Sequence, residues 1–293
     1  MAKNCQQLIS EATHRLLAHS DSALLDAEVL LSHTIQQSRS WIMAYQDEPV
    51  TEEHIAKFQA LVDRREAGEP IAYLTGEREF WSQTLAITPD VLIPRPETEI
   101  LVETALEFCP DNGDITLADL GTGSGAIAIA LASERPKAQI TAVDQSSAAL
   151  KVAIKNAQYN NIKNIDFRHG SWFTPLQGLR FDFIVSNPPY IADKDHHLSQ
   201  GDVRFEPQSA LSSGHDGLQD IYIIIEQAPD FLQTGGYLLL EHGFQQAPHV
   251  RELLKRRGFN RICTREDYSG NPRVTYAQYP ADKNSGQTKS KIL

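Results

Sequence analysis

A strand, a tight glycine turn and a helix are predicted between residues 117 and 132, and this unit constrains the fold more than any other. It reads Leu-Ala-Asp-Leu-Gly-Thr-Gly-Ser-Gly from Leu117 to Gly125, and small apolar residues follow up to Ala132. Such a turn brings the backbone close to a ligand at the mouth of a parallel sheet. The spacing is G-x-G-x-G, unlike the G-x-G-x-x-G of dinucleotide enzymes. The unit predicts an α/β fold with a ligand site at the turn.

A second strand is predicted at residues 139–144, and it ends in Asp144. A carboxylate about twenty residues past the glycines can accept hydrogen bonds from both ribose hydroxyls of a nucleoside ligand. A glycine turn alone is weak evidence and has a purely structural alternative. The acid at the end of the next strand makes a nucleoside site the better interpretation.

Asn187-Pro188-Pro189-Tyr190 directly follows the apolar run of residues 181–186. The side-chain oxygen of Asn187 and the carbonyl of Pro188 can both accept from one NH₂ group, and the prolines hold this backbone extended. The aromatic ring offers a flat surface to a planar group. These features suit an adenine, a cytosine or a carboxamide nitrogen. A proline-rich turn without a binding role is the alternative, which the upstream motifs disfavour.

The charge balance argues against a nucleic-acid substrate. The chain has 38 acidic and 27 basic side chains, a net charge of −11, whereas proteins that follow a phosphate backbone carry a basic face. The three cysteines show no metal-ligand spacing, so we expect reduced thiols and no metal. We find no signal peptide and no membrane-spanning run, which predicts a cytoplasmic protein.

Residues 1–75 are predicted to form a small helical bundle. Thr51 caps one helix, with Glu52 and Glu53 in its first turn. Two further helical faces are apolar, and their residues are Leu8, Ile9, Ala12, Leu16 and Leu17, then Leu24, Ala27, Leu31 and Ile35. The bundle is either a folding appendage or a clamp for a macromolecular substrate, and we favour the clamp.

The remaining chain divides into three parts. Residues 76–95 alternate apolar and polar side chains around Trp81, which predicts a β-hairpin linker. Helices and strands alternate in residues 96–280, and this order suits a seven-stranded, mostly parallel sheet covered on both faces. The expected strands lie near 115–120, 139–144, 165–169, 181–186, 236–241, 260–264 and 274–279. Residues 281–293 are polar, and we predict that they are disordered.

Together these motifs resemble the S-adenosylmethionine-dependent amino-methyltransferases, whose fold is Rossmann-like. The segments 69–80, 91–103 (with Ile-Pro-Arg-Pro-Glu-Thr-Glu), 201–207 and 238–243 are similar to those of the peptide-chain release factor N5-glutamine methyltransferases, the PrmC or HemK family. The resemblance extends to about Tyr279. It implies methyl transfer from S-adenosylmethionine to the glutamine of the Gly-Gly-Gln loop of class-one release factors.

The resemblance also implies roles for individual residues. The cofactor site would comprise Gly121, Thr122, Gly123, Ser124, Gly125, Asp144, Trp172 and Asn187. The catalytic residues would be Asn187, Pro188 and Tyr190, and Pro189 would join them in binding the substrate. We do not expect His196, His197, His215 or His242 to act as bases, because the proton can leave after transfer. Arg95 and Glu206 are weaker candidates for ordering the active-site loop.

Two alternative functions remain open. A nucleic-acid adenine N6-methyltransferase uses the same tetrapeptide on a flipped base. A non-catalytic binding module could keep the fold, although the intact set of Gly121, Asp144 and Asn187 argues against it.

Overall fold

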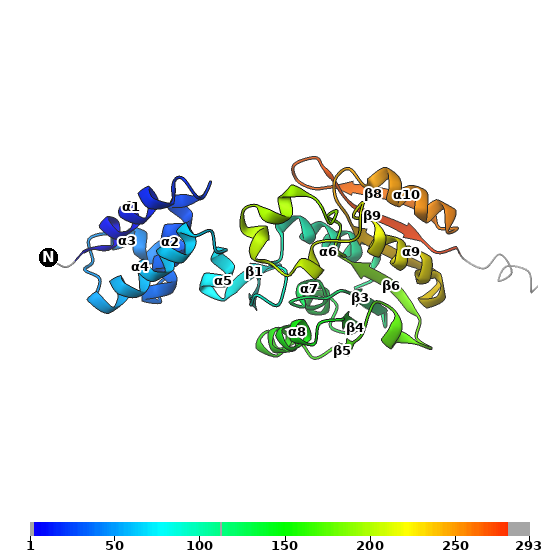
Figure 1. Ribbon diagram of the computed structural model, residues 1–293. Helices are drawn as coiled ribbons and strands as arrows, with labels where there is room; N and C mark the ends of the chain where they lie inside the picture. Colours follow the sequence, from blue (N-terminus) through cyan, green and yellow to red (C-terminus); the bar gives the residue numbers. More distant parts are fainter. Residues whose placement is uncertain (1–2, 112, 281–293) are drawn as a thin grey trace, which may run out of the picture. The chain divides into compact units, whose positions relative to one another are not determined.

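The computed structural model describes residues 3–111 and 113–280, in two compact units (Figure 1). Unit 1 comprises residues up to 77 together with the short segments 87–89 and 199–205, and unit 2 comprises the rest. The predicted tail, residues 281–293, lies outside the described residues. In the part of the chain that is described, no helix is both long and apolar enough to cross a membrane.

Unit 1 is built from helices. They are α1 (Cys5–Leu16), α2 (Ala23–Ile35), α3 (Arg39–Ala44), α4 (Glu52–Glu66) and α5 (Ile71–Thr75). The hydroxyl of Thr51 accepts from the backbone N–H of His54 at 3.3 Å, so the predicted cap of α4 is present. Leu8, Leu16 and Phe58 are among the side chains that fill the core. The short helices α3 and α5 were not predicted, because five or six residues are too few to show the helical repeat of apolar side chains.

Two leucines of the predicted apolar faces are not buried. Leu17 and Leu24 are 64% and 55% exposed, whereas their neighbours Leu16 and Ala27 are fully enclosed. Helix α1 ends at Leu16, so Leu17 lies just past its last turn, and Leu24 lies in the first turn of α2. The predicted apolar faces are therefore not fully covered at these helix ends.

Residues 199–205, which follow the Asn-Pro-Pro-Tyr segment in sequence, belong to unit 1. The buried Arg65 of α4 donates to Asp26 at 2.7 Å and to Asp202 at 2.8 Å. Arg204 donates to the carbonyl of Ala67 at 2.7 Å. A buried arginine needs such partners, because an unpaired charge is costly away from water. The sequence singles out residues 201–207 by their resemblance to the family, but no local pattern shows that residues 199–205 pack with unit 1, since their partners lie far away in the chain.

Unit 2 contains a hairpin and the main sheet. The hairpin consists of β1 (Glu77–Phe80), whose first residue is counted with unit 1, and β2 (Gln83–Ala86). Its turn residues Trp81 and Ser82 have φ of 50° and 58°, as a tight two-residue hairpin turn requires. The sheet strands are β3 (Thr116–Leu120), β4 (Gln139–Asp144), β5 (Ile165–His169), β6 (Phe181–Ser186), β7 (Leu232–Glu241), β8 (Asn260–Glu266) and β9 (Pro272–Gln278).

The sheet has seven strands in the order β5-β4-β3-β6-β7-β9-β8, and β9 runs antiparallel to both of its neighbours. The prediction of a seven-stranded, mostly parallel sheet is confirmed. Its helices are α6 (Glu99–Phe108), α7 (Ala126–Glu134), α8 (Ser147–Tyr159), α9 (Gln219–Phe231) and α10 (Ala247–Arg256). Ala118 and Leu120 pack with α9 and α10, whereas Asp119 contacts α7, so helices cover both faces.

Candidate functional site

Three predicted site segments meet at one edge of the sheet. Leu120 is aligned with Val143 of β4 and with Ser186 of β6, so Gly121, Asp144 and Asn187 lie at the carboxyl ends of adjacent strands. The chain passes from β3 to β4 on one side and returns to β6 on the other. Such a switch point is where open α/β sheets bind their ligands.

The glycines of the turn serve different purposes. Gly123 has φ of +56°, its backbone N–H donates to Asp144 Oδ2 at 2.8 Å, and a Cβ built there would meet no atom within 4 Å. Gly125 has φ of +85°, and a Cβ there would lie 3.1 Å from the Cβ of Ala153 in α8. Gly125 therefore permits close helix packing, whereas Gly123 faces open space that a ligand can occupy.

Thr122 and Ser124 shape the turn from within. The hydroxyl of Thr122 donates to Oδ2 of the buried Asp119 at 2.6 Å, and the Ser124 carbonyl accepts from Asn156 at 2.9 Å. Burial raises the pKa of Asp119 to about 7. The Thr122 side chain is turned away from the open side of the loop. Asp119 was not predicted as a site residue. An acidic side chain inside an otherwise apolar strand is the sequence signal that could have identified it.

Asp144 is held by the backbone. Its Oδ1 accepts from the N–H of Ser146 at 2.8 Å, while its Oδ2 accepts from Gly123. Burial raises the pKa of Asp144, and these backbone donors oppose that rise because they stabilise the charged form. Each carboxylate oxygen has a further lone pair for a ligand hydroxyl. The side chain is thus oriented before any ligand binds.

Trp172 stands beside the glycine turn. A Cβ on Gly121 would lie 3.3 Å from Cζ3 of the indole, and the partly buried ring also packs on the sheet core. The backbone of Trp172 has φ of +46°, an uncommon value for a bulky residue. The structure thus brings this predicted cofactor residue to the same edge as Gly121.

The Asn-Pro-Pro-Tyr segment is anchored at both ends. The Asn187 amide donates from Nδ2 to Thr98 Oγ1 at 3.1 Å. The hydroxyl of Tyr190 donates to Glu241 Oε1 at 3.3 Å, and burial raises the pKa of this phenol. Pro188 is buried and Pro189 is half-buried. The sequence did not indicate Thr98 and Glu241 as partners of the tetrapeptide, because these contacts depend on how β7 and α6 pack.

Arg95 and Glu206 form an ion pair. Glu206 also accepts from the backbone N–H of Ile93 at 3.0 Å, and its carboxylate is fully buried. These contacts join the chain after the tetrapeptide to the chain before α6. Arg95 and Glu206 are the two residues that we predicted to order this loop, and the geometry suits that role.

The histidines have surroundings that do not suit a catalytic base. His242 is buried, its Nε2 lies 2.7 Å from the hydroxyl of Thr275, and burial lowers its pKa, so it is a neutral core residue. His215 is exposed. His196 and His197 lie beside Asp195 on the surface. Three adjacent surface groups of this kind are insufficient to indicate a metal centre.

Comparisons with known proteins agree along nearly the whole chain. Residues 7–76 match the PrmC N-terminal domain, and residues 97–206 match the Methyltransferase small domain. The release factor glutamine methyltransferase of Escherichia coli is 49% identical over 274 residues, covering 94% of this chain and 98% of that protein. The enzyme of the same name from Aliivibrio fischeri is 45% identical and covers 96% and 100%, respectively.

A solved structure supports the fold independently. A methyltransferase from Pyrococcus furiosus superposes with a TM-score of 0.52 at 19% identity, covering 76% of this chain and 98% of that one. At this identity the likeness concerns the fold alone.

Proposed function

The chain belongs to the release factor glutamine methyltransferase family, and from this premise we propose that it methylates the side-chain amide nitrogen, N5, of a glutamine. The substrate is the Gly-Gly-Gln loop of class-one peptide-chain release factors, and the methyl donor is S-adenosylmethionine. The observation that carries the proposal is the anchored Asn187 at the sheet edge that also holds Gly123 and Asp144. A cytoplasmic location follows from such a substrate.

The residues at this edge fit the adenosyl part of the cofactor. Gly123 leaves open space, Asp144 offers two oriented carboxylate oxygens to ribose hydroxyls, and the Trp172 ring provides a flat apolar surface for adenine. When bound, S-adenosylmethionine supplies the methyl group on a sulfonium centre. In this proposal the cofactor is held by Gly121–Gly125, Asp144 and Trp172. Asn187 lies beside the methionine part of the cofactor.

The substrate amide is oriented by acceptors. A carboxamide nitrogen is a poor nucleophile, because its lone pair is shared with the carbonyl. Asn187 Oδ1 and the carbonyl of Pro188 accept hydrogen bonds from its two N–H groups. Pro189 and Tyr190 line the space that the substrate amide occupies. Positioning and stabilisation of the positive character that develops on the nitrogen then supply most of the acceleration. The proton leaves after transfer, so no strong base is required.

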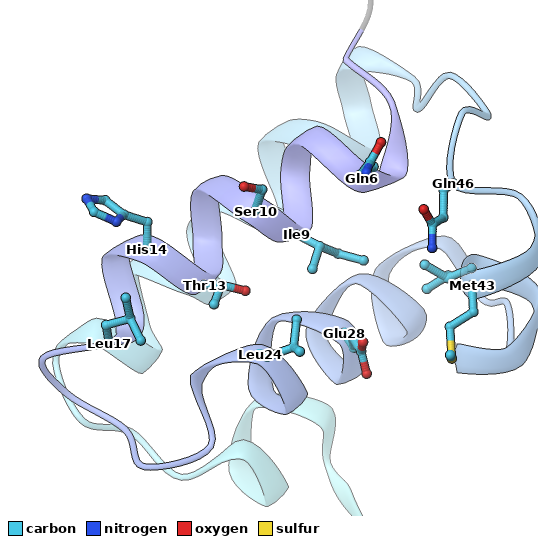
Figure 2. A pocket seen from close by; sticks show the side chains of 11 residues that line it. Gln6, Ile9, Ser10, Thr13, His14, Leu17, Leu24, Glu28, Met43 and Gln46 are labelled. Carbon is cyan, nitrogen blue, oxygen red and sulfur yellow. The ribbon is translucent and has the colours of Figure 1, made fainter.

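Unit 1 offers a surface for the rest of the release factor. A pocket of about 460 Å³ lies among α1, α2 and α3, and Leu17, Leu24 and Met43 line it (Figure 2). Leu24 and Met43 are 55% and 61% exposed. Residues 3–76 carry eleven acidic and six basic side chains, which favours a basic protein partner. A pocket with both apolar and polar lining residues, in an acidic unit, suits a macromolecular substrate, and a small amide would have no use for it.

Substitution of the pocket residues tests this role. The double variant Leu24→Ser, Met43→Ser should raise the KM for full-length release factor about tenfold, since each side chain loses apolar contact with the partner. A short peptide carrying the glutamine should be methylated as before. Tyr159→Ser, a change at an exposed aromatic residue of unit 2, is the matched control. Equal loss on peptide and full-length substrate would instead assign unit 1 to support of the catalytic fold.

The reaction itself is tested by transfer of a tritium-labelled methyl group. Release factor, the same factor with the loop glutamine replaced by alanine, DNA and RNA are offered separately. We expect label only on the unaltered release factor. Label on DNA or RNA adenine would favour the nucleic-acid alternative. Absence of label on every substrate, with cofactor bound normally, would favour a binding module.

A further inference from the structure

Gln246 lies in the turn between β7 and α10, and its side-chain amide joins parts of unit 2 that are far apart in the chain. Its Nε2 donates to the carbonyl oxygens of Tyr190 at 3.0 Å, Gly217 at 3.3 Å and Asp216 at 3.5 Å. Its Oε1 accepts from the backbone N–H of Gly243 at 2.9 Å. One half-buried side chain thus links the last residue of the Asn-Pro-Pro-Tyr segment to the loops before α9 and after β7.

These contacts fix which end of the Gln246 amide donates. A carbonyl oxygen can only accept a hydrogen bond, and an N–H group can only donate one. Because Nε2 faces carbonyl oxygens and Oε1 faces an N–H group, the reversed amide would set oxygen against oxygen and N–H against N–H. The backbone N–H of Gln246 also donates to the carbonyl of Gly243 at 2.9 Å, which closes the turn that carries the side chain. The donor to Tyr190 is therefore oriented before any substrate binds.

We infer that Gln246 is a positioning residue for methyl transfer, because it holds the carbonyl of Tyr190 and with it the carboxyl end of the tetrapeptide. This inference rests on the proposed function. Pro188 and Pro189 have no backbone N–H, so no backbone donor can anchor the chain between Asn187 and Tyr190. The direction of the Pro188 carbonyl, a proposed acceptor for the substrate amide, therefore depends on the anchors on either side of the prolines.

The chain around Tyr190 is built for this contact. The N–H of Ile191 donates to the carbonyl of Leu211 at 3.0 Å, and the carbonyl of Ile191 accepts from Ser213 at 2.9 Å. Gly217, in the same loop as Leu211 and Ser213, has φ of +74°, and a Cβ there would lie 2.3 Å from the carbonyl oxygen of Tyr190. A glycine permits this approach, which brings both carbonyls within reach of one amide.

Gln246→Glu tests the inference, and Gln245→Glu is its matched control. The first change sets a carboxylate oxygen against the carbonyl of Tyr190, so the single-turnover rate on a glutamine peptide should fall about tenfold. The KM for peptide and the affinity for S-adenosylmethionine should change far less, because their contacts remain. Gln245 is exposed, so the same change of charge there should leave the rate nearly unaltered. Gln246→Met, which loses the donor without gaining charge, should lie between wild type and Gln246→Glu.

Rates are divided by the concentration of cofactor-binding sites from calorimetry, so that a smaller folded fraction does not mimic slow chemistry. The full wild-type rate in Gln246→Met would overturn the inference, even if Gln246→Glu failed to fold. An equal loss in Gln245→Glu, or a loss confined to cofactor affinity, would do the same. Wild-type protein that methylates no glutamine peptide would refute the proposed function itself, whereas active wild type with equally active variants would refute only this inference.

Discussion

Replacement of Asn187 by alanine is expected to slow the chemical step by roughly two to three decades, a loss like that of one oxyanion-hole donor. The variant removes one of two proposed acceptors for the substrate amide and leaves Thr98 without its donor. Single-turnover methyl transfer to release factor measures the effect. Cofactor affinity should change far less than the rate, because the cofactor contacts of the glycine turn and Asp144 remain.

Asn187→Asp is the matched variant for this experiment. It keeps an acceptor oxygen of similar size but has no N–H to donate to Thr98, and its charge costs more to desolvate. The expected order of rates is Asn above Asp above Ala. Near-normal turnover by Asn187→Ala would show that Asn-Pro-Pro-Tyr is merely a rigid turn, and the glutamine would have to be oriented by other groups.

Replacement of Asp144 by alanine should weaken cofactor binding by roughly one to two decades, since hydrogen bonds to a charged acceptor contribute about 1.5–3 kcal/mol. Calorimetric titration with S-adenosylmethionine measures this directly. The carboxylate also accepts from the N–H of Gly123, so the variant loses an anchor of the glycine turn together with the ribose acceptors.

Asp144→Asn is the conservative variant for this experiment. Its single amide oxygen can still accept from Gly123, while its NH₂ end faces the N–H of Ser146 and can accept neither from it nor from a ribose hydroxyl. An intermediate dissociation constant is expected. An unchanged constant in folded Asp144→Ala protein would remove Asp144 from the cofactor site.

The sheet was predictable because its central strands β3, β4 and β6 are mostly apolar runs of five or six residues between turn signals. The rule that ligands bind where strand order reverses then placed Gly121, Asp144 and Asn187 at one edge, and the observed strand order agrees. Their proximity is seen in the structure, while the ligands they hold remain a prediction. The same patterns did not show that Leu17 and Leu24 are exposed. A helical repeat of apolar residues identifies a helix face, but it does not show what packs against that face.

The sequence by itself determined the sheet, the glycine turn and the acceptor tetrapeptide, since each is encoded by residues close together in the chain. Only the tertiary structure decided that Thr98 and Glu241 hold the two ends of that tetrapeptide and that Asp202 pairs with Arg65. Such partners come from elements far apart in sequence. They are chosen when strands and helices pack, a step at which buried polar groups must find partners that no local pattern records.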